Sequence, residues 1–389
     1  MLRSTAFAAI GLLALTAAAP ADDDKAADYA SDAKSLAGLI ADNYAYLDDL
    51  PGGVVPSSPQ LDAERDAVHD ADSLLRYAED MIAALADHHA LTAKSFKDDW
   101  AIVPSYADIW IVKRGGTYVV DAVKDGSVAA RGGVRAGERL VGVDGQPIDT
   151  AVAAFWSRIG LQPVGERAPF AARVLAAGRR DRQRVLTFAG LAGERTLTLD
   201  TLYKEQPDRP ALTVTTSKGV TTIRFNNSIG DLDTIKAFDA AMAAVPGKVP
   251  VVIDLTDTPS GGTTAIARAV MGWFVTRAMP YQMHELPAEQ RETGIARRWV
   301  EYVLPRAGKF HPGPVSVRAG RWTGSMGEGL ASGFLALGKP ACGTAMAGLK
   351  GGVYDFDLPK TGLRVKFPAE RIYTVAGAPR EKLVLKPCR

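Results

Sequence analysis

The sequence predicts a multidomain α/β protein, with a helical segment, a β-rich segment and an alternating strand–helix segment in that order. Apolar residues recur at helical spacing near the N-terminus, at every second position in the middle, and in alternating strand-like and helix-like runs toward the C-terminus. The 389 residues exceed one compact domain at ~150 residues per domain, and 47% hydrophobic residues supply a sizeable core.

The charge balance argues against some classes of partner. The 46 basic and 44 acidic residues leave a net charge of +2. Nucleic acids and anionic membranes select strongly basic surfaces, so we expect neither as the main partner.

Residues 1–21 are predicted to be an export signal peptide. A basic start, Met1–Arg3, precedes the apolar run Ala6–Ala17, and the small residues Ala19–Ala21 suit a cleavage site. The run is shorter than the ~20 apolar residues of a membrane span, although an uncleaved anchor stays open. We expect a periplasmic or secreted protein without integral membrane association after cleavage. In an oxidising compartment Cys342 and Cys388 could pair, but sequence cannot test their spacing.

Residues 25–98 are predicted to form a helical hairpin with a structural role. Leu36, Ile40 and Tyr44 recur at helical spacing, and a second such series, Leu74–Leu85, follows the Pro/Gly/Ser-rich break Pro51–Pro59.

Residues 99–203 change to a period of two. Short strands around Ile109–Ile111 and Tyr118–Val120 precede a small-residue helix and glycine turn in Gly126–Leu140, then a strand with an Asp144-Gly145 hairpin turn. Helices near 151–159 and 168–177 and a strand at 195–199 complete the segment. This order resembles the PDZ domain in the circularly permuted arrangement of bacterial proteases. The resemblance implies capture of a substrate tail at a sheet edge, and the alternative is a rigid spacer that binds nothing.

Residues 204–389 alternate between strands and helices, which predicts a core sheet covered by helices. We expect Glu292–Tyr302 to form a further helix near the active-site cleft. The main strands are predicted at 220–225, 249–255, 315–319, 353–358 and 364–367, and the main helices at 263–275 and 327–337.

Two loops of this segment could carry chemistry. The strand Val251–Leu255 runs into a Pro/Ser/Gly loop ending at Gly261-Gly262, where backbone N–H groups at a helix start suit an oxyanion hole. A second strand delivers Ser325 into a glycine-rich turn before an apolar helix. Taken alone, the first could be a tight turn and the second a helix N-cap.

Together, the loop Asp254–Gly262 and the turn Ser325–Glu328 resemble the S41 peptidase family, which includes the tail-specific proteases and tricorn. The family places an Asp-Leu-Arg-x-Asn-x-Gly-Gly-like loop upstream of a Ser-x-x-Glu turn, behind a helical N-domain and a PDZ domain. The resemblance implies a ClpP/crotonase-like core and Ser325 as nucleophile. Backbone N–H groups of Met326 and of Gly261 or Gly262 would hold the oxyanion.

The resemblance leaves the general base open. Tail-specific members use a lysine, which Lys350 matches in spacing, although the usual Gly-Lys-Gly reads Gly-Leu-Lys-Gly here. Lys350 would have to lose its charge to act, and a surface lysine is the alternative. Tricorn-like members use a histidine and a glutamate. Glu381 resembles that glutamate, but Arg224 stands where the family pattern places the histidine, and arginine is no base.

The resemblance implies a serine endopeptidase acting on exported or misfolded polypeptides, with no cofactor. A non-catalytic protein that holds a peptide or small ligand on the same scaffold is the alternative. An α/β-hydrolase is excluded because its histidine must follow the serine. We expect no metal site, since the adjacent His88 and His89 would point about 100° apart on a helix and lie more naturally near a helix end. All five histidines precede Ser325: His69, His88, His89, His284 and His311.

Overall fold

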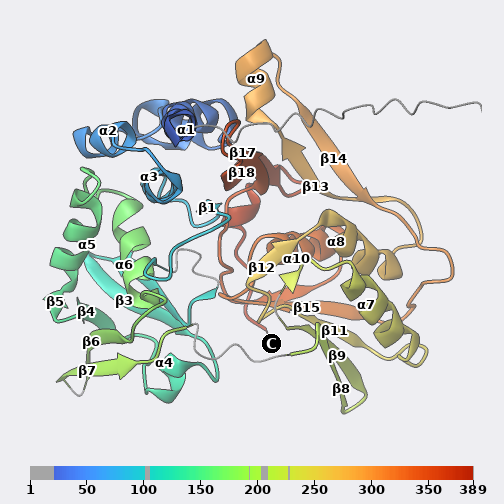
Figure 1. Ribbon diagram of the computed structural model, residues 1–389. Helices are drawn as coiled ribbons and strands as arrows, with labels where there is room; N and C mark the ends of the chain where they lie inside the picture. The colour runs from blue at the N-terminus through green and yellow to red at the C-terminus, as the bar shows by residue number, and fades with distance from the viewer. Residues whose placement is uncertain (1–21, 101–105, 192, 203–208, 227, 389) are drawn as a thin grey trace, which may run out of the picture.

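A computed structural model describes residues 22–100, 106–191, 193–202, 209–226 and 228–388. Figure 1 shows N-terminal helices at the top left, a β-rich domain below them, and an α/β part on the right. The parts follow one another in the predicted order, so the mixed multidomain α/β class is confirmed. The ClpP/crotonase-like description of the core stays a prediction. None of the helices in the described ranges is both long and apolar enough to cross a membrane.

The N-terminal part contains three α-helices, where the sequence predicts a hairpin of two. The additional helix begins inside the Pro/Gly/Ser-rich break, because the Ser58 hydroxyl accepts the Leu61 N–H at 3.1 Å and Pro59 occupies the first helical position. These local signals outweigh the turn-like composition of the break. The elements are α1 (Asp22–Asn43), α2 (Pro59–Asp66) and α3 (Ala71–Ala84), with 3₁₀ turns at Leu47–Asp49 and Pro51–Gly53.

The middle part is a six-stranded antiparallel sheet in the order β2-β3-β4-β6-β7, with β5 paired to β4. The predicted hairpin turn has Asp144 and Gly145 at φ values of 49° and 76°, the positive values that a type I′ turn requires. Both predicted helices are present. The strands are β2 (Ile109–Arg114), β3 (Thr117–Val123), β4 (Arg139–Val143), β5 (Gln146–Pro147), β6 (Arg184–Gly190) and β7 (Gly193–Leu199), and the helices are α4 (Val128–Arg131), α5 (Ile148–Ser157) and α6 (Arg167–Ala177).

The α/β part is built on a sheet in the order β16-β15-β11-β9-β8, parallel except for β8. A two-stranded parallel pair, β10 with β12, lies beside it. The strands are β8 (Leu212–Ser217), β9 (Val220–Phe225), β10 (Ser228–Ile229), β11 (Val251–Asp254), β12 (Ser260–Gly262), β15 (Val315–Ala319) and β16 (Ala341–Gly343), and the helices are α7 (Asp233–Ala243), α8 (Thr264–Met271) and α10 (Met326–Ala336), with a 3₁₀ turn at Gly272–Phe274.

A second sheet, β1-β18-β13-β14 with β17 on β18, stands between the α/β part and the N-terminal helices. The predicted helix at Glu292–Tyr302 is wrong, because Trp299, Val300 and Tyr302 belong to a strand whose side chains alternate between half-buried and exposed. Aromatic and β-branched residues favour a strand. The elements are β1 (Leu91–Thr92), β13 (Met279–Glu285), α9 (Pro287–Thr293), β14 (Arg298–Val303), β17 (Gly352–Asp357), β18 (Arg364–Tyr373) and a 3₁₀ turn at Arg380–Lys382.

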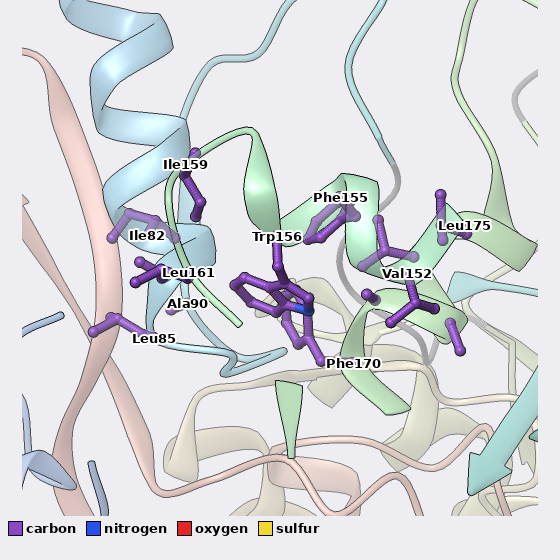
Figure 2. Close-up of a cluster of buried hydrophobic side chains, with 14 of the residues drawn as sticks. Ile82, Leu85, Ala90, Val152, Phe155, Trp156, Ile159, Leu161, Phe170 and Leu175 are labelled. Carbon is purple, nitrogen blue, oxygen red and sulfur yellow. The ribbon is translucent and has the colours of Figure 1, made fainter. Parts of the chain in front are cut away.

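One hydrophobic core joins the N-terminal helices, the β-rich domain and part of this second sheet. Figure 2 shows Ile82 and Leu85 at the C-terminal end of α3 packing toward Trp156 and Phe170 of the β-rich domain. Trp156 is completely buried, and its indole N–H donates to the Arg167 carbonyl at 2.8 Å. A separate core fills the α/β part.

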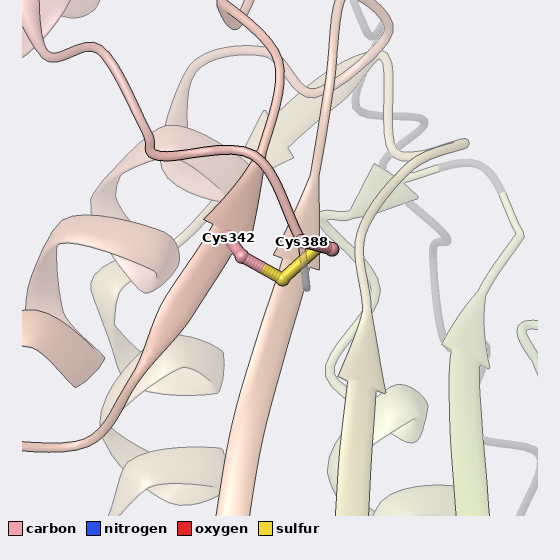
Figure 3. The surroundings of a disulfide bond; sticks show 2 residues. All are labelled: Cys342 and Cys388. Atoms are coloured by element: carbon pink, nitrogen blue, oxygen red, sulfur yellow. A yellow bond between two sulfur atoms is a disulfide. The ribbon is translucent and has the colours of Figure 1, made fainter.

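A disulfide joins Cys342 in β16 to Cys388 in the C-terminal tail, with Cα atoms 4.9 Å apart (Figure 3). This settles the pairing that the sequence left open. The bond fixes the tail against the edge of the parallel sheet.

We predict that Trp156→Ala destabilises the N-terminal helices together with the β-rich domain. Removing a fully buried large side chain from a shared core costs about 3–5 kcal/mol. Hydrogen exchange under mild denaturant should show faster opening in both α3 and α5. Val164→Ala, at a side chain that is 60% exposed, is the control. Faster exchange confined to the β-rich domain would contradict a shared core.

Candidate active site

Ser325 lies in the turn that connects β15 to α10, directly before the first residue of the helix. Its φ is 53°, a left-handed conformation that is uncommon for residues other than glycine. Its backbone N–H donates to the Glu328 carboxylate at 2.9 Å, which stabilises this conformation. Strained backbone conformations of this kind are concentrated at functional sites, where the surrounding structure stabilises them.

The loop Asp257–Gly262 lies against this turn. Thr258 forms a β-bridge with Thr323, and the Gly324 N–H donates to the Thr258 carbonyl at 2.9 Å. The Thr323 hydroxyl also donates to the Leu255 carbonyl at 2.7 Å. Two segments far apart in the sequence are thereby held side by side.

Gly261 makes the closest approach to Ser325. A Cβ atom on Gly261 would lie 2.5 Å from Ser325 Oγ and 2.3 Å from the Met326 nitrogen, so only glycine fits there. Met326 is the first residue of α10, where a backbone N–H has no partner within the helix. A Cβ on Gly262 would instead meet the Ile229 carbonyl at 2.0 Å. The structure therefore brings Gly261 and Met326 to Ser325, and Gly262 packs on the neighbouring strand.

The buried Glu328 carboxylate joins the Ser325 turn to a second loop. Besides the Ser325 N–H, it accepts the N–H groups of Gly348 and Leu349 at 2.8 and 3.1 Å. Burial raises the pKa of Glu328 to about 7, although Arg380 and the three N–H groups oppose the rise. The proton equilibrium of this carboxyl thus falls near neutral pH.

The loop Gly348–Gly351 is also held from its other side. The buried Arg380 guanidinium donates to the carbonyls of Leu349 and Gly351 at 3.2 and 2.7 Å. His89 Nδ1 lies 2.5 Å from the carbonyl oxygen of Lys350. The position of this loop therefore depends on hydrogen bonds to its backbone and not on its own side chains.

His89 has the properties of a neutral imidazole. It is buried, and burial lowers its pKa to about 4. A carbonyl oxygen only accepts hydrogen bonds, so Nδ1 carries the proton and Nε2 carries the lone pair. His89 therefore presents a basic nitrogen on its other side.

His89 and Ser325 line the same cavity, which has a volume of about 610 Å³. In the described parts of the chain no group of three or more ligating side chains could hold a metal ion. Other residues that line the cavity include Gly261, Gly262, Met326, His284, Tyr354, Glu370 and Arg380.

The side chain of Lys350 points elsewhere. Its Nζ lies 3.1 Å from Asp49 Oδ2 and 4.9 Å from the centre of the Tyr46 ring. Lys350 lines a neighbouring cavity, not that of Ser325. The Glu381 Oε2 atom is buried without a hydrogen-bond partner among the described residues. Burial, followed by the nearby Glu381 charge, raises the pKa of Tyr46.

Asp257, at the start of the glycine loop, pairs with cations from two other segments. Arg224 Nη2 lies 3.2 Å from Asp257 Oδ2, and Lys124 of the β-rich domain lies 2.6 Å from the other carboxylate oxygen. Arg224 thus pairs with the loop that carries Gly261.

His284 on the cavity wall was not expected from the sequence. It stacks on Trp299, with ring centres 5.0 Å apart, and its two nitrogens lie 3.2 Å from Glu301 and 3.2 Å from Glu370. Burial opposes a charged ring, but the two carboxylates raise the pKa of His284 to about 9. His284 is therefore an imidazolium at neutral pH and a poor base.

His89 was also missed, although the sequence holds a signal. The adjacency of His88 and His89 excludes a shared metal ion, but it does not exclude one of them as a general base. The structure separates the two rings: His88 stacks on Phe170 and accepts from Arg173 Nε at 2.8 Å. The Asp87 carboxylate accepts the His89 backbone N–H at 2.9 Å. The Asp-His-His segment is therefore a turn that fixes the position of His89.

Comparisons with known proteins agree with this architecture. The family model of the PDZ domain matches residues 119–156. The structure is similar to the photosystem II D1 C-terminal processing protease, with a TM-score of 0.55, 15% identity and 92% of each chain covered. It is also similar to mature CPAF, with a TM-score of 0.55, 13% identity, and 93% of this chain and 92% of that chain covered. A search of curated proteins finds no match.

At such low identity the likeness shows the fold alone. The chain has the fold of S41-type serine peptidases with a PDZ domain, and the resemblance inferred from the two loops is confirmed at that level.

We predict that Gly261→Ala strongly slows reaction at Ser325 while the fold is kept. The added methyl group would collide with Ser325 Oγ and the Met326 nitrogen, displacing the proposed oxyanion donor. Removing one such donor typically lowers kcat by about 10²–10³-fold. Labelling of Ser325 by a fluorophosphonate measures the effect. Gly38→Ala, where a Cβ meets nothing within 4 Å, is the control, and equal labelling of both variants would contradict the prediction.

We predict that Glu328→Gln changes how stability depends on pH. The carboxyl of the folded chain holds its proton up to a pKa of about 7, against an ordinary value of 4.5. The folded state therefore binds more protons between these values, so this group's contribution to stability falls as pH rises from about 4.5 to 7. Unfolding midpoints across this range should show that decline in wild type and not in Glu328→Gln. Glu292→Gln, at an exposed carboxylate, is the control, and parallel profiles for wild type and Glu328→Gln would contradict the prediction.

Proposed function

We propose that this chain is a serine endopeptidase with Ser325 as its nucleophile. The observation that carries the proposal is the position of Ser325. Ser325 lies in a left-handed turn at the start of α10, in close contact with Gly261. The cavity that it lines also contains a neutral histidine. Polypeptide substrates are supported by the processing protease among the proteins of similar fold.

In the proposed reaction, Ser325 Oγ attacks the carbonyl carbon of the scissile bond and its proton passes to Nε2 of His89. The backbone N–H groups of Met326 and of Gly261 or Gly262 bind the oxygen that becomes negative. His89 then gives the proton to the leaving amine, and water hydrolyses the acyl-enzyme by the same route. The Lys350 carbonyl orients His89 by accepting its Nδ1–H.

Lys350 and Glu381 stay alternatives as the activating groups. Lys350 would need to leave Asp49 and turn into the cavity of Ser325, which it does not line. Glu381 does not line the cavity of Ser325 and would need to move toward it. The geometry favours His89 over both.

We further propose that substrates reach Ser325 as extended polypeptide tails. Capture at the β2 edge would require Arg173 to move, because its Nη1 donates to the Ile111 carbonyl at 3.2 Å. A rigid-spacer role for the β-rich domain is the alternative. Cleavage rates for peptides that differ only in a free or amidated C-terminus distinguish the two.

Export to the periplasm or beyond the cell is also a proposal. The disulfide between Cys342 and Cys388 supports an oxidising compartment. Cell fractionation, followed by N-terminal sequencing of the mature chain, tests both export and cleavage after residue 21.

We predict that wild type reacts with a fluorophosphonate probe and cleaves an unstructured peptide, and that Ser325→Ala does neither. The probe requires an activated serine hydroxyl. Ser332→Ala, at a buried serine further along α10, is the matched control and should react as wild type does. Equal signals from wild type and Ser325→Ala would favour the ligand-binding alternative.

We predict that the acid limb of kcat/KM lies near pH 4. The pKa of His89 is lowered to about 4 by burial, so the ring is neutral and basic above that pH. A lysine base would instead place the limb far higher, since its ordinary pKa is ~10.4. His89→Ala should remove activity, and Lys350→Met should largely keep it. Loss in Lys350→Met alone would assign the lysine as base.

A further inference from the structure

β14 leaves one edge of the second sheet open. It is the last strand in the order β1-β18-β13-β14, and none of the described strands pairs with its outer edge. Figure 1 shows β14 along the outer side of the molecule. The unpaired N–H and C=O groups of such an edge can pair with another strand.

A stripe of large apolar side chains follows this edge. Val300, Tyr302 and Leu304 are 39, 49 and 59% exposed, and their spacing of two places them on one face. Among the exposed large apolar residues in the described ranges, no others alternate in this way along one strand. The stripe continues across the sheet, because Val300 is in register with Met283 and Met283 with Tyr373.

The edge lacks the usual protection against pairing. Lysine, proline or unpaired charges commonly prevent edge strands from pairing with another chain. The sequence of β14, Arg-Trp-Val-Glu-Tyr-Val, contains neither lysine nor proline. Its charged residues are engaged within the sheet: Arg298 lies 2.7 Å from Glu285, and Glu301 lies 3.2 Å from His284. Each of these charges thus has a partner of opposite sign within the sheet.

The sequence of β14 is complementary to itself in the antiparallel direction. About a two-fold axis at Val300, Arg298 would face Tyr302 and Trp299 would face Glu301, while Val300 would face its own copy. No like charges meet, and a cation lies against an aromatic ring on each side.

We propose that β14 pairs with β14 of a second copy of this chain, about a two-fold axis at Val300, to form one continuous sheet across a dimer. A two-fold pair covers both edges at once. A substrate strand is the weaker occupant, because none of the residues of β14 lines the Ser325 cavity. The proposal does not depend on the reaction at Ser325.

Single cysteines test the contact directly. The native cysteines are joined in one disulfide, so Val300→Cys introduces the one free thiol. Directly opposite residues have Cβ atoms about 4.5–5.5 Å apart, within reach of a short bis-maleimide. Val214→Cys is the matched control, at a 46% exposed valine on β8, the edge strand of the other sheet.

Light scattering after size exclusion should give twice the chain mass for wild type and for Val214→Lys, and the mass of one chain for Val300→Lys. The cross-linker should join Val300→Cys into dimers and leave Val214→Cys as monomers. A monomeric wild type, a Val300→Lys variant that stays dimeric, or equal cross-linking of the two cysteine variants would overturn the proposal. So would a monomer whose Val300→Cys thiol is protected only when a peptide substrate is added.

Discussion

The carboxylate of Glu328 accepts backbone N–H groups from three residues, and the geometry of the candidate active site depends on this one group. It fixes Ser325 in its left-handed turn and holds Gly348 and Leu349 of the facing loop. That loop in turn supplies the carbonyl that orients His89. A buried acceptor with three donors is costly to disturb, because each N–H left without a partner would lose its hydrogen bond in a dry environment.

This arrangement changes how the Gly-Leu-Lys-Gly loop is interpreted. In the sequence, the lysine side chain of this loop is a candidate general base. In the structure its backbone is engaged at nearly every residue, by Glu328, Arg380 and His89, while the Lys350 side chain pairs with Asp49. The loop can therefore position a base through its main chain even if its own side chain takes no part in the chemistry.

The sequence predicts well the features that depend on neighbouring residues. The strand, glycine loop and helix around Gly261, and the turn at Ser325, are local patterns with strong preferences, and the structure places these two segments together. The roles of Ser325, Gly261, Gly262 and Met326 stay predictions that experiments must test.

Features that depend on distant contacts were harder to predict. His89 reaches the cavity because β1 pairs with β18, a register of Leu91 with Lys366 that no local pattern reveals. The helix predicted at Glu292–Tyr302 is a strand in its second half, where Arg298 and Glu301 pair across strands and Arg297 lies over Trp299. Tertiary pairing overrides local propensity in such segments.

The division of the hydrophobic interior has a consequence for control of activity. His89 lies at the border of the core shared by the N-terminal helices and the PDZ domain, whereas Ser325 begins a helix packed in the core of the α/β part. The two members of the proposed catalytic pair thus belong to two hydrophobic cores, which are joined by polar contacts such as Trp322 with Ala107 and Lys124 with Asp257. The alignment of base and nucleophile therefore depends on the contacts between the two cores, so a substitution at their border would disturb the pair while each core stays packed.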